Sequence, residues 1–525
     1  MGTKDAEIFS DRVQALATKI QESIRSTREG VKYYLPPADG ITEKAKSRRH
    51  HIIFGRRGSG KSSLLNKVYE DTLSSRQPCA FVDLEQFKGH SYPDVLISVL
   101  ITTFTEYKSW LSEAAIAPAT KKTFWSRFSF EKPDSAKMKK KEANDLNDRI
   151  TNEINYLNSL LHEPDEADTE HAKSVDLGQS ATVSAQAKTH APGIGEAGVN
   201  AEASESSNVS ESQLVRYSSK KIEKLHRKII DFRQLFRDIS DRAKAPAYLL
   251  LDDLYHIRYD DQAIMIDYFH KIVKGVNVWL KIGTIRHRSN WYIHGTPPIG
   301  VKLGDDVDQI DLDLTLEKYQ TTKLFLFKIL EKFCEECEVT MLDILADGAR
   351  DRLVLASGGV ARDFLTLFNK ALEEAKERVL QGKDARGPKI GAEDVNRAAG
   401  GYYDYKKEEL RRDSADESVS ETEALIDRVR KFCIEGTKAN CFLLEKDLKT
   451  KDANEISELV DLKFVHHVRS RVTVRNREGK IFDAFMLDLS FYAGDRARRG
   501  MELVEFWRPG GEDQLRKAGY IYKEA

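Results

Sequence analysis

Residues 51–71 read HIIFGRRGSGKSSLLNKVYED, an apolar run followed by a glycine-rich turn and an amphipathic pattern. From Gly55 to Ser62 the turn has the spacing Gly-x-x-x-x-Gly-Lys-Ser, which is the Walker A, or P-loop, spacing. The backbone N–H groups of such a turn converge on phosphate oxygens, and the N-terminus of the following helix faces the same anion. Ile52–Phe54 supply the strand before the turn and Leu64–Tyr69 the helix after it. The stretch therefore predicts a nucleoside triphosphate site.

The P-loop residues also predict the nucleotide and metal contacts. Lys61 would reach the β- and γ-phosphates of ATP, and Ser62 would coordinate Mg²⁺. A chance turn of Gly, Ser and Lys is the alternative, and the flanking strand and helix disfavour it. The segment before the first strand, with Tyr33, Tyr34 and Ile41, either closes over the adenine or packs on the core. The residues expected to hold the cofactor are Gly55, Arg56, Arg57, Gly58, Ser59, Gly60, Lys61, Ser62 and Ser63.

The composition bounds the class of protein. With 525 residues the chain is long enough for about two to four domains. Its 83 Lys and Arg residues nearly balance 84 Asp and Glu residues, so any nucleic-acid surface must be local. Five scattered cysteines fit a reducing compartment and predict a cytoplasmic protein. The N-terminus lacks an apolar signal core, and no run approaches the ~20 apolar residues of a membrane span.

A second apolar run ends in two acids, as a Walker B strand does. Residues 247–252 read AYLLLD and are followed by Asp253. A strand buried on both faces reads as a continuous apolar run of this kind. Asp252 would be a Mg²⁺ ligand, and Asp253 would polarise the attacking water. A buried acid cluster without a metal is the alternative, which the P-loop disfavours.

Three further residues are candidates for catalysis. The strand pattern VWLKIGT ends at Thr284, whose hydroxyl would contact the γ-phosphate or the water. Arg286 follows it, either as an arginine finger, worth about 10³–10⁵ in rate, or as part of a basic surface turn. In SGGVARD, residues 357–363, two glycines end one helix and Arg362 falls in the first turn of the next. Arginine is unfavourable there because of the helix dipole, so its position suggests contact with the nucleotide phosphates.

A long insertion separates the two halves of the predicted core. Its flanks, 143–161 and 220–239, have apolar residues at helical spacing and predict two antiparallel helices. Residues 163–212 hold too little apolar surface to order themselves and predict disorder. The insertion is expected to project from the core and is a candidate contact for a protein partner. Before it, residues 121–141 mix Lys and Arg with Phe and Trp, which fits a nucleic-acid or membrane surface or a solvated basic stretch.

The C-terminal part predicts a helical lid over 315–400, a charged linker, and then helices followed by a β-hairpin. This order indicates a winged helix. Its basic hairpin fits contacts to DNA phosphates, but a protein-binding winged helix with a soluble hairpin fits equally. The Cys334–Cys337 pair lies in a helical pattern without a second pair, so no zinc site is expected. The candidate DNA-contacting residues are Arg469, Arg471, Arg475, Arg477 and Lys480.

Together the patterns predict the fold class: an α/β P-loop NTPase with a parallel sheet, a helical lid, a helical and partly disordered insertion, and a C-terminal winged helix. The expected boundaries are 1–42 for an N-terminal helical segment, 43–130 and 220–314 for the two parts of the core, 131–219 for the insertion, 315–400 for the lid, 401–420 for a linker, 421–496 for the winged helix and 497–525 for a C-terminal extension.

This ordered set of motifs resembles the AAA+ ATPases of the origin-recognition and replication-initiator type and their STAND-like signalling relatives. The resemblance covers residues 45–130 and 216–495. It implies that Thr284 is the residue termed sensor 1 and Arg362 the residue termed sensor 2. Two features depart from the pattern. Asp253 replaces the usual Glu, which implies slow hydrolysis, and the long insertion is not a feature of the initiators.

Two functions remain open from the sequence. In the first, an ATP-hydrolysing AAA+ switch acts on DNA, or is recruited to it, through the winged helix. In the second, a STAND-like signalling or defence scaffold oligomerises with ATP and binds protein partners instead of DNA. Both predict ATP and Mg²⁺ as cofactors, and both are compatible with a homo-oligomer.

Overall fold

The computed structural model describes residues 7–24, 29–112, 138, 140–163, 199–383, 387–413, 416–446, 451–475, 477–493 and 501–522. Most of the basic and aromatic stretch predicted over 121–141 lies outside these residues. So does 164–198, the larger part of the segment predicted to be disordered. In the part of the chain that is described, no helix combines the length and the apolar character that crossing a membrane requires.

Five parallel strands within the described residues form the central sheet, in the order β2-β3-β4-β1-β7. Phe54 lies opposite Thr284 and Asp83 opposite Asp252, so the P-loop and the acidic residues meet at the carboxyl edge of the sheet. The predicted α/β fold class is confirmed. The strands are β1 (His51–Phe54), β2 (Cys79–Asp83), β3 (Ala247–Asp252), β4 (Val278–Thr284) and β7 (Asp308–Asp311).

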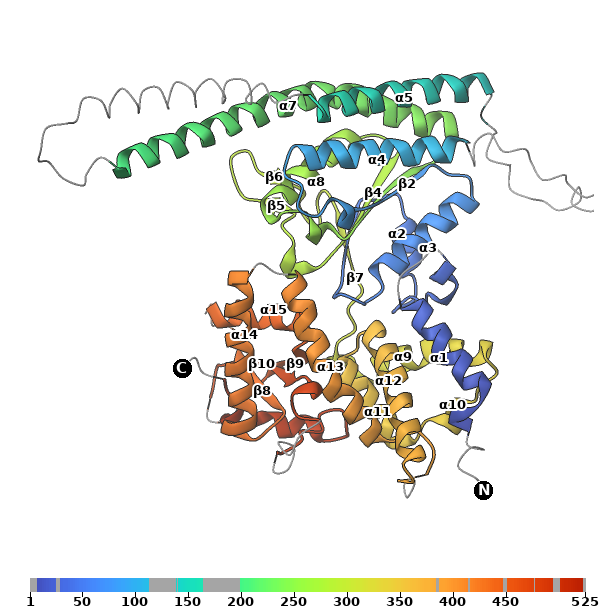
Figure 1. Cartoon of the computed structure of the whole chain (residues 1–525), viewed down its shortest axis with the longest axis vertical. Coiled ribbons are helices and arrows are strands. Elements are labelled where there is room, and N and C mark those ends of the chain that lie inside the picture. Colours follow the sequence, from blue (N-terminus) through green and yellow to red (C-terminus); the bar gives the residue numbers. More distant parts are fainter. Residues whose placement is uncertain are drawn as a thin grey trace, which may run out of the picture.

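Helices cover both faces of this sheet (Figure 1). Because side chains alternate along a strand, Ile52 and Phe54 join one core and Ile53 another. The first core includes α4 and α8, and the second includes α2 and α3. A two-stranded hairpin, β5 (Tyr292–Ile293) and β6 (Ile299–Gly300), follows β4. The helices are α2 (Ile41–Lys46), α3 (Lys61–Ser74), α4 (Asp94–Trp110) and α8 (Tyr259–Val273).

The insertion forms two antiparallel helices, α5 (Lys140–Leu161) and α7 (Val199–Ala243). Ion pairs fix their direction, because residues later in α7 pair with residues earlier in α5: Lys228 with Glu153 at 3.1 Å and Arg242 with Asp145 at 2.6 Å.

Helix α5 and the C-terminal part of α7 pack on the core, whereas the N-terminal part of α7 extends beyond it in Figure 1. Leu146 and Ile150 of α5 and Phe232 of α7 are fully buried in the same core as Phe104 of α4, and both helices lie along α4 in Figure 1. The prediction of a projecting insertion was therefore wrong only for the packed parts of the two helices.

Residues 199–212, at the end of the segment predicted to be disordered, form the start of α7. A helix that is already nucleated by a packed segment extends at little further cost, even where its residues bring no apolar surface. Composition alone does not distinguish such an extension from an unstructured chain.

The lid consists of helices beyond β7, and the N-terminal helix α1 (Asp11–Ser23) shares its core. The predicted linker over 401–420 was wrong, because α13 continues to Asp413 and α14 begins at Asp416. Tyr402, Lys406 and Leu410 are buried at intervals of four, a helical stripe that the surrounding charges conceal. The lid helices are α9 (Tyr319–Glu336), α10 (Met341–Ile344), α11 (Asp347–Ser357), α12 (Ala361–Leu380) and α13 (Ala392–Asp413).

The C-terminal domain contains helices and an antiparallel sheet with the order β8-β10-β9. The hairpin expected after the helices is formed by β9 and β10, which pair antiparallel. The residues from 501 to 522 pack against this sheet, where the Tyr522 amide donates to the Leu443 carbonyl at 2.8 Å. The elements are α14 (Asp416–Lys431), β8 (Cys441–Glu445), α15 (Lys451–Asp461), β9 (Val465–Val472) and β10 (Phe482–Leu487).

Two substitutions on α7 test whether the insertion belongs to the core. Phe232→Ala should lower the free energy of unfolding by about 3–5 kcal/mol, because it leaves a cavity beside Phe104. Ile230→Ala is the control, since its side chain is 76% exposed, and should change stability by less than about 0.5 kcal/mol. Urea unfolding followed by circular dichroism measures both. Equal, small effects would mean that the insertion does not stabilise the core.

Candidate functional site

A cavity of about 750 Å³ lies between the P-loop and the lid. Its walls come from segments far apart in the chain: residues 57–63 of the P-loop and α3, the residues after β2 and β3, the first turn of α12, and aromatic residues of α9 and of the segment before α2. Such a cavity is large enough for a small ligand. One end is polar and the other is apolar.

The P-loop provides the polar end. Gly58 and Gly60 have φ angles of 89° and 100°, which glycine adopts without strain. Lys61 is buried, and its ammonium group donates to the carbonyls of Gly55 at 2.9 Å and Arg56 at 3.3 Å. Burial lowers the pKa of Lys61, and the nearby Asp253 and Asp252 oppose that shift. The lysine is thus held at the floor of the cavity by the loop that it follows.

Acidic residues at the ends of β2 and β3 face the P-loop. Burial, and secondarily the Asp253 charge, raise the pKa of Asp252 to about 7, while a hydrogen bond with Ser62 opposes the shift. Ser62 and Asp252 are therefore placed as a pair that could hold one cation. Asp253, with φ of 54°, starts the turn after β3 and also lines the cavity.

Further acidic and imidazole groups near this end were not singled out from the sequence. Asp83 and Glu85 line the cavity, and Glu85, Asp253 and His256 have ligand atoms within 4.8 Å of one another, a spacing that could hold a metal ion. The one local pattern in the sequence that could have indicated Asp83 was the apolar run that ends at this residue. The structure places that strand beside β3.

The lid reaches the P-loop closely at the start of α12. The Arg362 amide donates to the Gly58 carbonyl at 3.3 Å. A Cβ atom on Gly58 would lie 2.7 Å from the Cβ atom of Arg362, so the glycine is needed for this approach. The contact brings Arg362 to the cavity beside the P-loop.

The apolar end is lined by aromatic and aliphatic side chains. Tyr33 stacks on Phe333 with ring centroids 4.4 Å apart, and its hydroxyl donates to Glu336 at 2.5 Å. Tyr34 also lines the cavity, but Ile41 is not among its lining residues. A flat heterocycle would fit such an end, because aromatic and apolar groups stack on ring faces.

Besides Gly55, which is not among the lining residues, three predicted site residues have side chains that lie away from the cavity. Thr284 is fully buried, and its hydroxyl forms a hydrogen bond with that of Ser289. Arg286 lies over the Phe54 ring, 3.9 Å from its centroid, and pairs with Asp311 at 3.0 Å. Neither Thr284 nor Arg286 lines the cavity.

Arg56 is the third of these residues. Its guanidinium group donates to Asp313, to the Leu314 carbonyl at 2.8 Å and to the Gly358 carbonyl at 3.2 Å, and it does not line the cavity. The expected cofactor contact of the Arg56 side chain was therefore wrong. Its neighbour Arg57 does line the cavity. Arg56 instead fastens the P-loop to the lid.

Comparisons with known proteins give similarity in solved structures only. No family model and no curated protein matches the chain. Similar structures include the Orc1 protein of Aeropyrum pernix in complex with DNA, with 14% identity over 89% of this chain and 94% of that chain at a TM-score of 0.36. A Walker-type ATPase of Pyrococcus abyssi has 11% identity over 88% of this chain and 95% of that chain, at a TM-score of 0.39. Drosophila ORC bound to DNA has 10% identity over 92% of each chain, at 0.33.

Two of these structures are named as Orc1 and ORC, and the third is named as a Walker-type ATPase. At such identities and TM-scores they do not indicate the function of the present chain, which has to be inferred from its own residues.

Arg56→Met tests the fastening role. It should lower the free energy of unfolding by about 1–3 kcal/mol, because the buried Leu314 and Gly358 carbonyls lose their donor. Arg57→Met, one residue along, is the matched control and should have the smaller effect on stability. Thermal unfolding of both variants measures the difference. A larger loss for Arg57→Met would contradict this assignment.

Proposed function

We propose that this chain binds ATP with Mg²⁺ in the cavity and hydrolyses it, as an AAA+-type switch whose C-terminal domain contacts DNA. One observation carries the proposal: the P-loop, the Asp252–Asp253 turn and Arg362 come from three separate segments and line one cavity. This combination of an anion-binding loop, a cation-binding pair and a basic lid residue matches the charges of a magnesium nucleotide.

Each residue has a chemical role in this proposal. The P-loop amides and Lys61 bind the phosphates, and Lys61 exchanges its bonds to the loop carbonyls for bonds to phosphate oxygens. Ser62 and Asp252 would hold Mg²⁺, which supplies charge neutralisation for the phosphates. Arg362 stabilises charge on the γ-phosphate from the lid side, and Asp253 orients the attacking water.

The apolar end completes the proposed nucleotide site. The stacked Tyr33 and Phe333 rings accommodate the base. Thr284 and Arg286 are not assigned direct contacts, because the structure holds both away from the cavity. With a short Asp in the water-orienting position, we expect slow hydrolysis by the isolated chain.

Lys61→Ala tests nucleotide binding. Loss of a charged donor to phosphate should weaken ATP affinity by about 10- to 150-fold, corresponding to ~1.5–3 kcal/mol. Lys67→Ala is the matched control, a half-exposed lysine on the same helix whose ammonium group pairs with Asp71 at 2.8 Å. Isothermal titration calorimetry with Mg²⁺ and ATP compares the two. If Lys61→Ala binds ATP as tightly as Lys67→Ala does, the cavity is not a P-loop nucleotide site.

The proposed DNA contact rests on the C-terminal domain. The succession of α14, β8, α15 and the β9–β10 hairpin supports the proposal of a winged helix, with the hairpin as its wing. Arg469 pairs with Glu512, and Lys480 pairs with Glu445 at 2.7 Å. These two basic side chains are thus partly neutralised. Three exposed arginines near the hairpin tip, Arg471, Arg475 and Arg477, are better placed to contact phosphates.

A triple substitution of Arg471, Arg475 and Arg477 to Gln tests this surface. Because each phosphate contact adds about 0.9 to the slope of log affinity against log salt, the triple variant should lose roughly 2.7 of that slope. Arg469→Gln with Lys480→Gln is the control and should lose less. Fluorescence anisotropy with duplex DNA at several salt concentrations measures both.

An unchanged slope in the triple variant would remove DNA from the proposal. If such a protein still assembled with ATP in the absence of DNA, as light scattering would show, the signalling-scaffold function would take its place.

A further inference from the structure

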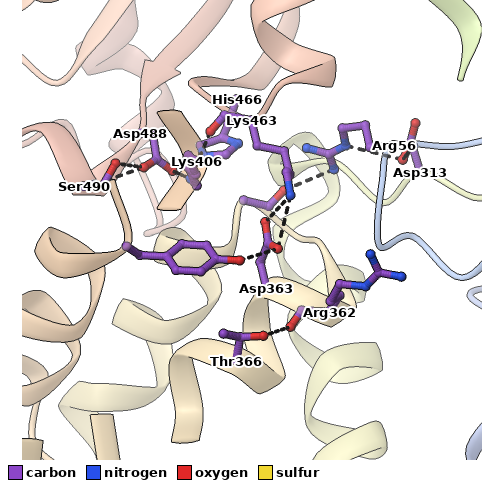
Figure 2. Close-up of polar contacts among 12 residues, drawn as sticks. Arg56, Asp313, Arg362, Asp363, Thr366, Lys406, Lys463, His466, Asp488 and Ser490 are labelled. Carbon is purple, nitrogen blue, oxygen red and sulfur yellow. Dashed lines mark hydrogen bonds and ion pairs between the residues drawn. The ribbon is translucent and has the colours of Figure 1, made fainter. Parts of the chain in front are cut away.

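A buried polar interface joins the lid to the C-terminal domain one residue beyond Arg362 (Figure 2). The Asp363 carboxylate pairs with the Lys463 ammonium group at 3.1 Å and accepts a hydrogen bond from the Tyr402 hydroxyl at 3.1 Å. Asp363 lies in the first turn of α12, Tyr402 on α13, and Lys463 in the turn between α15 and β9. Both charged side chains are almost completely buried.

A second ion pair continues the same interface. Lys406 of α13 pairs with Asp488 at 2.8 Å and also donates to the carbonyl of Lys463 at 3.0 Å. His466 forms a 2.7 Å hydrogen bond with Asp488. Burial alone would raise the pKa of Asp488, but Lys406 and His466 outweigh it and hold that pKa well below its ordinary value. The carboxylate is therefore charged, and the two ion pairs are connected through Lys463.

The P-loop touches this interface as well. Arg56 donates to the Gly358 carbonyl, and Gly358 lies so close to His466 that a Cβ atom would be 2.1 Å from the imidazole ring. Tyr405, next to Lys406 in the chain, lines the cavity. Three connections therefore lead to the C-terminal domain: one from the P-loop through Arg56, and two from the cavity, through Arg362 with its neighbour Asp363 and through α13.

The chemistry of the interface favours one docked arrangement. Each buried ion loses several kcal/mol of hydration free energy. The attraction between the two ions offsets this cost only when their geometry is good and their remaining polar atoms are hydrogen-bonded. An apolar interface would tolerate sliding, whereas these pairs lose their partners when the domain shifts. The interface is thus suited to two discrete positions, docked and released.

We propose that Asp363 and Lys463 are positioning residues that couple Arg362 to the docking of the C-terminal domain. The proposal rests on the proposed function, in which Arg362 contacts the γ-phosphate. Because ADP lacks the γ-phosphate, only ATP contacts Arg362 and so affects the position of the first turn of α12. Coupling of binding equilibria is reciprocal, so docking must also change the preference for ATP over ADP.

The test uses full-length Asp363→Asn and Lys463→Met and compares their ATP and ADP affinities by calorimetry. In the wild type ATP should bind more tightly than ADP, and each variant should reduce that ratio by about fivefold or more, the lower range of allosteric coupling. Lys463→Arg, which keeps the charge, should recover part of the ratio. Asp363→Asn has the same shape as the native side chain and lacks only the charge.

The matched control is Asp394→Asn, which breaks an equally buried ion pair between α12 and α13, Arg378 to Asp394 at 2.9 Å. This pair lies within the lid and does not reach the C-terminal domain. Asp394→Asn should lower the melting temperature and leave the ATP-to-ADP ratio unchanged. An unchanged ratio in Asp363→Asn and Lys463→Met, or an equal loss in Asp394→Asn, would overturn the coupling.

Hydrogen exchange of the wild-type protein covers the case in which the variants do not fold. Peptides from 402–410 and 463–468 should be better protected with one nucleotide than with the other, and equal protection would overturn the proposal. Failure of the proposed function gives a different result. In that case the wild-type protein would not bind ATP, or would bind it no more tightly than Lys61→Ala does.

Discussion

The contact between Gly58 and Arg362 is the constraint on which the rest of the site depends. A backbone with φ of 89° and no side chain lets the first turn of α12 lie directly against the P-loop. Two elements separated by about 300 residues of sequence thereby form one cavity. The aromatic end exists for the same reason, because α9 is carried with the lid to a position facing Tyr33. Without that approach the P-loop would face solvent.

The parts of the fold that were predictable from sequence are those determined by local pattern. The Walker A spacing places a strand at His51–Phe54 and a helix from Lys61 because glycine conformations and the helix N-terminus are local properties. β3 was recognisable because all six of its residues are buried, which requires an unbroken apolar run. In residues 402–413, by contrast, the pattern was misleading. The many charged residues there concealed a stripe of three buried residues and suggested a linker instead of a helix.

The parts of the site that were not predictable depend on distant partners. Arg56 and Arg57 are neighbours in an identical local context, yet Arg56 turns to Asp313 and the lid while Arg57 turns to the cavity. Thr284 ends the expected strand, but Ser289 holds its hydroxyl away from the cavity. Asp363 finds its counter-ion 100 residues later in the chain, at Lys463. Spacing motifs carry no information on such pairs.

Helix α13 has a mechanical consequence. It is one continuous helix of 22 residues, so at about 1.5 Å per residue it is roughly 33 Å long. It packs in the lid at one end and against the C-terminal domain at the other. It is helical from Ala392 to Asp413, including Gly400 and Gly401, so it is suited to act as a lever arm. A tilt of about 10° where it packs in the lid would displace its far end by roughly 6 Å, given that length. A sub-ångström adjustment beside the P-loop is thereby enlarged to the dimensions of a side chain.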